Sequence, residues 1–349
     1  MINAEQLPVI VPGIPTEQQR PSSIDAYTDT TDLYPVVRGR FNNFVTSYIL
    51  QGGNGPCPLL AVCNVLLFRG ELSLPESIRE ISFAELVGKL ANVLIDKNKA
   101  AENDETLRST LDKSVSLLGT LNKGLDVNVK FSGVEGFEYT PEMSIFDLLD
   151  IHVYHGWVVS EDDLSAYPYV IHLSYNQAME KLTQYEDVKA KVMRSTDIDS
   201  VTAEFRGVIE EGDAIAKWLN DTQNQLTSDG IIHLNSTLQN LDLAVLFRNN
   251  HFSVLHKRNE SLFALVTDVG FKNTGVMWES IDQLDGDTLY LDSSFCSIRP
   301  DHQRTSSTPA ETDYDMAMRL QYGARTNSII VPPGNVSTVR QPKRCCSLM

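Results

Sequence analysis

Cys57 stands between two prolines in the segment QGGNGPCPLLAVCNVLLF, directly before a long apolar run. Pro58 suits the first turn of a helix, where a backbone amide hydrogen has no partner anyway, so we expect Cys57 at the N-terminus of a helix. The helix dipole and the unpaired amides at that position stabilise a thiolate and lower the pKa of a thiol. The pattern therefore indicates a nucleophilic cysteine. The alternative is a small core residue, which is what we expect of Cys63 on the apolar stripe of the same helix.

Gln51 lies six residues before Cys57, at the end of an expected strand. Its side-chain amide could donate a hydrogen bond to an oxyanion that forms beside the thiolate. A thiolate enzyme also needs a general base that is distant in sequence and close in space. His251 follows a short polar turn in LAVLFRNNHFSVLHK and begins an expected strand, where alternation places it on one face with Ser253 and Leu255. The residues predict a Gln–Cys–His site. The alternatives are that Gln51 is an ordinary surface residue and that His251 is an exposed histidine in a turn.

The hydrophobic pattern predicts an α+β fold, a papain-like variant in which an early helix carries the cysteine and a later antiparallel sheet carries the histidine. We expect helices over 58–68, 82–95 (with Ser82 as N-cap), 174–192 and 202–226, and strands over 44–50, 124–131, 243–247, 251–257 and 261–268. Residues 1–35 read as a flexible N-terminal segment, and from residue 299 the chain turns polar and rich in Pro, Ser and Thr.

The formal net charge of −17 makes nucleic acid an unsuitable partner for the body of the protein. Basic residues gather at the C-terminus: five lie beyond Met316 and no acid does, which leaves a net charge of −22 on the rest. The five cysteines form no disulfide framework and no CxxC pair, so we expect no structural metal and no cofactor. With no secretory signal and no apolar run long enough for a membrane span, we expect a cytoplasmic protein.

Several multi-residue blocks carry a family resemblance when taken in order. They are QGGNGPCPLLAVCNVLL, GLDVNVKFSGVEGFEYTPEMSIFDLLDI, YHGWVV, LSYNQ, FRNNHFS, LVTDVGF and VMWES. Together they resemble the MINDY family of deubiquitinating cysteine proteases, with a catalytic domain over 36–298. The resemblance implies hydrolysis of isopeptide bonds in polyubiquitin, with a preference for long chains linked through lysine forty-eight. It implies Cys57 as nucleophile, His251 as general base and Gln51 as oxyanion donor.

The resemblance also implies roles for residues outside the Gln–Cys–His set. Thr267 would orient the imidazole, and Asp268 is the alternative because a carboxylate more often does this. Ubiquitin contacts would fall on Asp126, Val127, Trp157, Tyr175 and Phe247. For Val127 and Phe247 the plain alternative is a place in the core.

The tail contains two further patterns. Residues 311–323 (ETDYDMAMRLQYG) resemble a short ubiquitin-interacting helix, with Ala317 and Leu320 as contact residues and a transient helix as the alternative. The terminal CSLM (346–349) fits a prenylation signal on Cys346, and Cys345 could take a palmitoyl chain. Lipid and basic residues together would hold the protein at a membrane surface. The rival to an isopeptidase is therefore a lipid-anchored adaptor that binds ubiquitin chains and cleaves them weakly or not at all.

Overall fold

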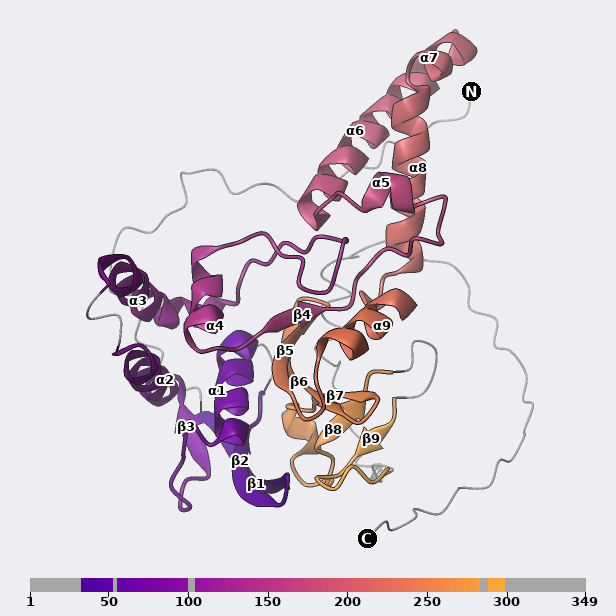
Figure 1. The fold of residues 1–349 in the computed structure, drawn as a ribbon. Coiled ribbons are helices and arrows are strands. Elements are labelled where there is room, and N and C mark those ends of the chain that lie inside the picture. The colour runs from indigo at the N-terminus through magenta and orange to yellow at the C-terminus, as the bar shows by residue number, and fades with distance from the viewer. Residues whose placement is uncertain (1–32, 53–54, 100–103, 283–287, 299–349) are drawn as a thin grey trace, which may run out of the picture.

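The computed structural model describes residues 33–52, 55–99, 104–282 and 288–298, which form two β-sheets with helices around them (Figure 1). The smaller sheet has the strand order β2-β1-β3 and consists of β1 (Leu33–Phe41), β2 (Phe44–Ile49) and β3 (Glu80–Ser82). The larger sheet has the order β4-β5-β6-β7-β8-β9 and consists of β4 (Val153–His155), β5 (Leu243–Arg248), β6 (His251–Arg258), β7 (Ser261–Leu265), β8 (Trp278–Ser280) and β9 (Tyr290–Leu291).

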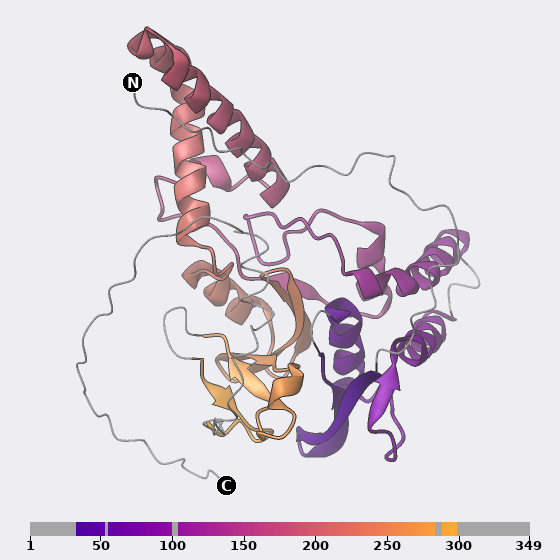
Figure 2. The same ribbon diagram turned by 180° about the vertical axis from the view of Figure 1, so that it is seen from behind.

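Most helices lie between β3 and β5 in the sequence. The α-helices are α1 (Cys57–Arg69), α2 (Phe83–Lys97), α3 (Glu105–Leu117), α4 (Ser144–Leu148), α5 (Tyr167–Val170), α6 (Tyr175–Arg194), α7 (Ile198–Glu204), α8 (Arg206–Asp221) and α9 (Ser228–Thr237). Three short 3-10 helices are η4 (Leu118–Lys123), η5 (Pro141–Met143) and η6 (Val269–Phe271). Helices α6 and α8 run side by side and project from the body as an arm, with α7 at its far end (Figures 1 and 2).

Helix α1 is the centre of the main core. Every residue from Pro58 to Leu67 is buried, and the helix packs against β2, β5 and β6. A helix that is apolar on nearly all sides is stable only when neighbours enclose it, which explains the long apolar run in the sequence, interrupted by Asn64. Gly70 ends the helix in the left-handed conformation, with φ of 73°.

The larger sheet is covered on both faces, with α1 on one side and α9 on the other (Figures 1 and 2). Along β6, Phe252 and Val254 pack in the cluster that contains α1, whereas Leu255 packs in the second cluster with Leu234 of α9. The β5–β6 hairpin sets this alternation. Its two turn residues, 249 and 250, have φ of 51° and 58°, so that the last residue of β5 pairs with the first residue of β6.

The structure confirms the mixed α+β class and several predicted elements. The helices predicted over 58–68 and 82–95 correspond to α1 and α2, and Ser82 caps α2 in a capping box with Glu85. Cys63 is fully buried, as predicted, and burial raises the pKa of its thiol to about 12. The strand predicted from 44 corresponds to β2, and the strands predicted from 243, 251 and 261 correspond to β5, β6 and β7.

Other predictions were wrong. Residues 124–131 form no strand: only Val129 and Lys130 make isolated bridges, with Phe137 and Ser174. Val129 and Phe131 are buried and Asp126 and Lys130 are exposed, as the alternation indicates, but Asn128 is also buried, and the chain turns back so that Lys130 N donates to Gly136 O. The helix predicted over 202–226 is divided and shorter, since α7 ends at Glu204 and α8 runs from Arg206 to Asp221. The larger sheet is also not purely antiparallel, because β4 pairs with β5 in parallel.

Some predicted features lie outside the described residues. They are the helix at 311–323 with Ala317 and Leu320, and the lipidation signal with Cys345 and Cys346. Among the described residues, no helix has the length and apolar content to span a bilayer. Within the same residues, no three His, Cys, Asp or Glu side chains are grouped to hold a metal ion.

Candidate active site

Cys57 is the first residue of α1, as its flanking prolines predict. Pro56 occupies the N-cap position and Pro58 lies in the first turn. No side chain of the described residues caps this helix, and its first turn contains no acid. A negative charge on the Cys57 sulfur would therefore meet the positive end of the helix dipole without a competing carboxylate in that turn. The cysteine is half-buried against the main core.

Gln51 and Cys57 direct two hydrogen-bond donors at one oxygen atom. Gln51 Nε2 donates to the carbonyl oxygen of Gly55 over 3.3 Å, and the backbone amide of Cys57 donates to the same oxygen over 2.9 Å. Two preorganised donors that converge on one oxygen are the arrangement of an oxyanion hole. The space around Gly55 is tight, since a Cβ atom there would lie 2.9 Å from Gln51 Cγ. Sequence reasoning missed Gly55, because no residue pattern reports which way a carbonyl points.

The main chain of Gln51 lies against the segment that follows β7. Its amide donates to Thr267 O over 2.6 Å, its carbonyl accepts from Val269 N over 3.0 Å, and it forms a parallel bridge with Asp268. The Thr267 side chain is buried, whereas Asp268 is exposed and its carboxylate accepts a hydrogen bond from Gly270 N to cap η6. The structure thus brings Gln51, Cys57 and Thr267 into one neighbourhood.

His251 begins β6, one of the strands that pack against α1. It pairs with Arg248 across the hairpin and is half-buried. Burial lowers the pKa of its imidazole to about 4, so that the ring is neutral near pH 7 and able to accept a proton. Alternation places its side chain with Leu255, on the face away from α1. His251 is the terminal residue of β6, directly after the β5–β6 turn.

Comparison with known proteins identifies the family. The family described as MINDY deubiquitinase matches residues 32–295, which include both sheets and all the helices given above. The chain belongs to the MINDY deubiquitinase family.

Curated MINDY relatives agree with this match. The chain is 39% identical to ubiquitin carboxyl-terminal hydrolase MINDY-1 of Rattus norvegicus over 334 residues, which are 88% of the chain and 66% of that relative. It is 39% identical to MINDY-2 of Bos taurus (81% of the chain, 44% of the relative) and 36% identical to MINDY-1 of Danio rerio (79% and 53%). The chain spans about half the length of the curated relatives it matches.

The ubiquitin contacts that the MINDY resemblance implies differ in exposure. Asp126 is exposed, and Val127 and Tyr175 are half-buried against the main core. Trp157 and Phe247 are only 4% and 7% exposed. A backbone hydrogen bond links the segments of Val127 and Tyr175, since Tyr175 N donates to Val129 O, two residues after Val127. Their contact with ubiquitin stays a prediction, and for Trp157 and Phe247 it requires a change in the side chains that now cover them.

Trp157 is held by its neighbours in this MINDY fold. Its indole N–H donates to Thr222 Oγ1 over 2.7 Å, and its ring lies 5.6 Å from Trp218 in a stacked arrangement. Its backbone N–H donates to His155 Nδ1 over 3.1 Å, while the other ring nitrogen of His155 lies 3.1 Å from Gly136 O. The indole and the backbone of Trp157 are therefore both held by hydrogen bonds. The sequence did not indicate that His155 is the partner of the Trp157 backbone.

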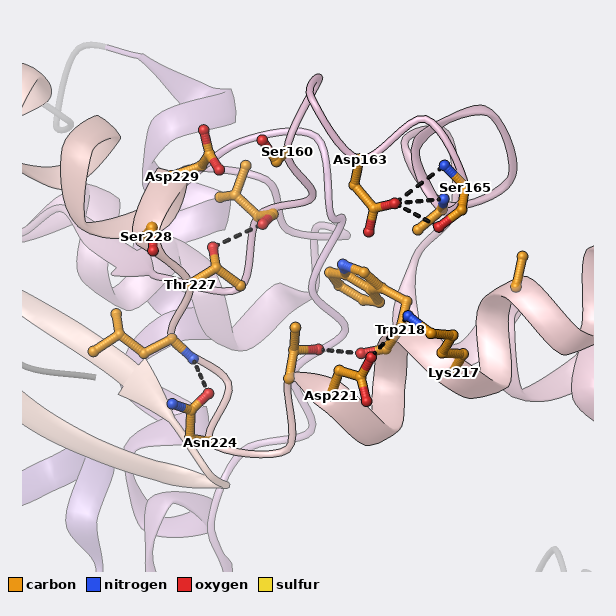
Figure 3. Close-up of a pocket in the computed structure, with 15 residues that line it drawn as sticks. Ser160, Asp163, Ser165, Lys217, Trp218, Asp221, Asn224, Thr227, Ser228 and Asp229 are labelled. Carbon is orange, nitrogen blue, oxygen red and sulfur yellow. Dashed lines mark hydrogen bonds and ion pairs between the residues drawn. The ribbon is translucent and has the colours of Figure 1, made fainter. Parts of the chain in front are cut away.

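A polar cavity of about 300 Å³ lies beside Thr222. It is enclosed by the end of α8, the start of α9 and the loop after β4, with the Trp218 ring at its wall (Figure 3). Several of its polar groups already have partners: Thr227 Oγ1 donates to Val158 O over 2.7 Å, and Asp163 accepts hydrogen bonds from the 165–166 segment. Because these polar groups bond to other parts of the protein, we assign the residues that line the cavity a structural role at the base of the α6–α8 arm.

Proposed function

We propose that this protein is a thiol-dependent deubiquitinase that hydrolyses isopeptide bonds in polyubiquitin and prefers long chains linked through lysine forty-eight. The observation that carries the proposal is the pair of donors from Gln51 and Cys57 at the tip of α1, in a chain of the MINDY family. The names of the relatives, ubiquitin carboxyl-terminal hydrolases, support the substrate class.

In the proposed mechanism, His251 takes the proton from Cys57, and the thiolate attacks the carbonyl carbon of ubiquitin's C-terminal glycine. Gln51 Nε2 and the Cys57 amide stabilise the oxyanion, and the Thr267 hydroxyl orients the imidazole. The protonated His251 then gives its proton to the departing lysine amine. Water afterwards hydrolyses the thioester and releases the ubiquitin carboxylate.

One conformational step must precede this chemistry. The Gly55 carbonyl oxygen now accepts both proposed oxyanion donors. A substrate carbonyl can use these donors only after the Gly55 carbonyl has turned away. In the proposed enzyme, the peptide group between Gly55 and Pro56 therefore changes its orientation before the substrate carbonyl can bind.

The test is incubation of the full chain with defined tetra-ubiquitin of each linkage, beside Cys57→Ala. The proposal expects cleavage of lysine-forty-eight-linked chains by the wild type and none by Cys57→Ala, with equal thermal unfolding of the two proteins. If the wild type binds these chains and leaves every linkage intact, the protein is an adaptor and the enzymatic proposal is wrong.

A further inference from the structure

Asn64 is a fully buried polar residue in the middle of the apolar helix α1. Its carboxamide makes two hydrogen bonds with one residue of β2. Asn64 Oδ1 accepts from Ile49 N over 2.7 Å, and Asn64 Nδ2 donates to Ile49 O over 3.0 Å. Buried polar groups are costly unless they are paired, and here the side chain and the main chain satisfy one another.

The position of Ile49 explains why it needs a side-chain partner. Strand β2 is an edge of the smaller sheet, and Ile49 lies opposite Val36 of β1. The backbone amide of Val36 points away from β2 and donates to Arg79 O. The N–H and C=O of Ile49 therefore face outward from the sheet, toward α1, where an apolar side chain in place of Asn64 would leave both without a partner.

This pair of bonds joins the two elements that carry the proposed oxyanion donors. Asn64 is seven residues after Cys57, about two turns along α1, and so lies on the same face of the helix. Ile49 is two residues before Gln51. The direct connection from Gln51 to Cys57 contains glycines at 52, 53 and 55, and glycine restricts the backbone least of all residues. The spacing between the two donors therefore needs support from outside that connection.

We propose that Asn64 is a positioning residue for the oxyanion donors: its two bonds to Ile49 fix the register of β2 against α1, and with it the separation of Gln51 Nε2 from the Cys57 amide. The inference rests on the proposed function for its catalytic consequence. Asn64 touches neither Gly55 nor the substrate, and it acts through Ile49. Because catalysis falls steeply with small displacements of reacting groups, the loss of this constraint lowers kcat more than it changes KM.

The test compares Asn64→Leu with Asn98→Leu in the full chain. Leucine approximates the shape of asparagine and removes both bonds. Asn98, the residue after α2, is the control: its Nδ2 also makes two hydrogen bonds, to Leu94 O (2.8 Å) and Leu148 O (2.9 Å), and so joins α2 to α4. At a temperature where circular dichroism shows every variant folded, kcat of Asn64→Leu falls about tenfold to a hundredfold, with KM within about threefold. The kcat of Asn98→Leu stays within about twofold of the wild type.

A second variant tests the role of the hydrogen bonds themselves. Burial keeps a carboxyl group protonated, so Asn64→Asp presents one acceptor and one O–H donor to Ile49. The kcat of Asn64→Asp therefore exceeds that of Asn64→Leu. Equal kcat values for Asn64→Leu and Asn98→Leu would overturn the inference, and so would the absence of recovery in a folded Asn64→Asp.

An additional readout separates this inference from the proposed function. The rate at which iodoacetamide alkylates Cys57, followed by peptide mass spectrometry across pH, needs no ubiquitin. In Asn64→Leu the pH profile of this rate shifts relative to the wild type, and in Asn98→Leu it does not. If the wild type cleaves no ubiquitin chain, the proposed function fails. An unshifted Asn64→Leu profile then overturns the positioning role, and a shifted one upholds it.

Discussion

Gln51 and Cys57, six residues apart in sequence, donate hydrogen bonds to the same oxygen atom, the carbonyl of Gly55, over 3.3 and 2.9 Å. The side-chain amide of one residue and the main-chain amide of the other thus define a site for a single oxygen. In the proposed reaction that oxygen belongs to the substrate.

Removal of the Gln51 amide tests whether this site acts in the transition state. We expect Gln51→Ala to lower kcat by about 10²- to 10³-fold with little change in KM, because the oxyanion donor acts after the substrate has bound. Steady-state kinetics on tetra-ubiquitin give both constants. Gln223→Ala, two residues beyond the end of α8, is the control and keeps the wild-type kcat. A Gln51→Ala enzyme with normal kcat and a raised KM would assign Gln51 to substrate binding.

The pH dependence of activity tests the state of His251. Burial lowers the pKa of this imidazole to about 4, below the ordinary value for histidine of 6.5. The neutral ring is the proposed base. Activity should therefore persist as the pH falls through about 6 and disappear as it approaches about 4. The measurement is kcat/KM across this range, limited to conditions where the protein stays folded. A loss of activity centred between about pH 6 and 7 would contradict the lowered pKa of His251.

Thr267 and Asp268 can be separated as orienting groups. The Thr267 side chain is buried beside Gln51, while the Asp268 carboxylate is exposed and caps η6. We therefore expect Thr267→Val, which removes only the hydroxyl, to reduce kcat by about tenfold to a hundredfold, because the imidazole that transfers the proton is no longer oriented. Asp268→Asn, whose amide oxygen can still accept from Gly270 N, should keep kcat within about threefold. The opposite ranking would make Asp268 the orienting residue.

His155 links stability to pH. Burial lowers the pKa of its imidazole to about 4, although hydrogen bonds to main-chain oxygens oppose the shift. Below about pH 6.5 the unfolded chain binds a proton at this residue and the folded chain does not. The folded state is therefore stabilised above that pH and loses this contribution as the pH falls toward about 4. Urea denaturation at about pH 7 and pH 5 should show a smaller difference for His155→Gln than for the wild type.

The control for that experiment is His233→Gln, because His233 is exposed on α9. It should keep the wild-type difference between the two pH values. The pKa values of His251 and His256 are also lowered by burial, so part of the pH dependence remains in His155→Gln. A His155→Gln protein with the full wild-type difference would show that His155 does not contribute to it.

The sequence predicted the local parts of the site better than the contacts between them. Pro58 is a local signal, and it predicted where α1 begins. The meeting of Gln51 with Asp268 joins residues more than 200 positions apart, and no local pattern encodes such a pairing. The strand predicted over 124–131 failed for a related reason, because alternation reports which side chains are buried and not whether a strand partner exists.

Asn64 is a sequence signal that was not used to predict the site. An asparagine inside an otherwise apolar helix must find partners for its amide, and this requirement can be inferred from sequence. The identity of the partner, the main chain of Ile49, depends on how an edge strand packs against α1, which only the structure gives. The orientation of the Gly55 carbonyl is likewise a property of the fold.

Cys57 can be identified as the nucleophile with ubiquitin whose C-terminal glycine carries a thiol-reactive electrophile. After incubation with the full chain, intact mass and peptide mapping identify the modified residue. We expect one ubiquitin per chain, attached to Cys57, with no adduct in Cys57→Ala and a normal adduct when the exposed Cys296 is replaced by serine. An adduct on another cysteine, or none with folded wild-type protein, would contradict this role of Cys57.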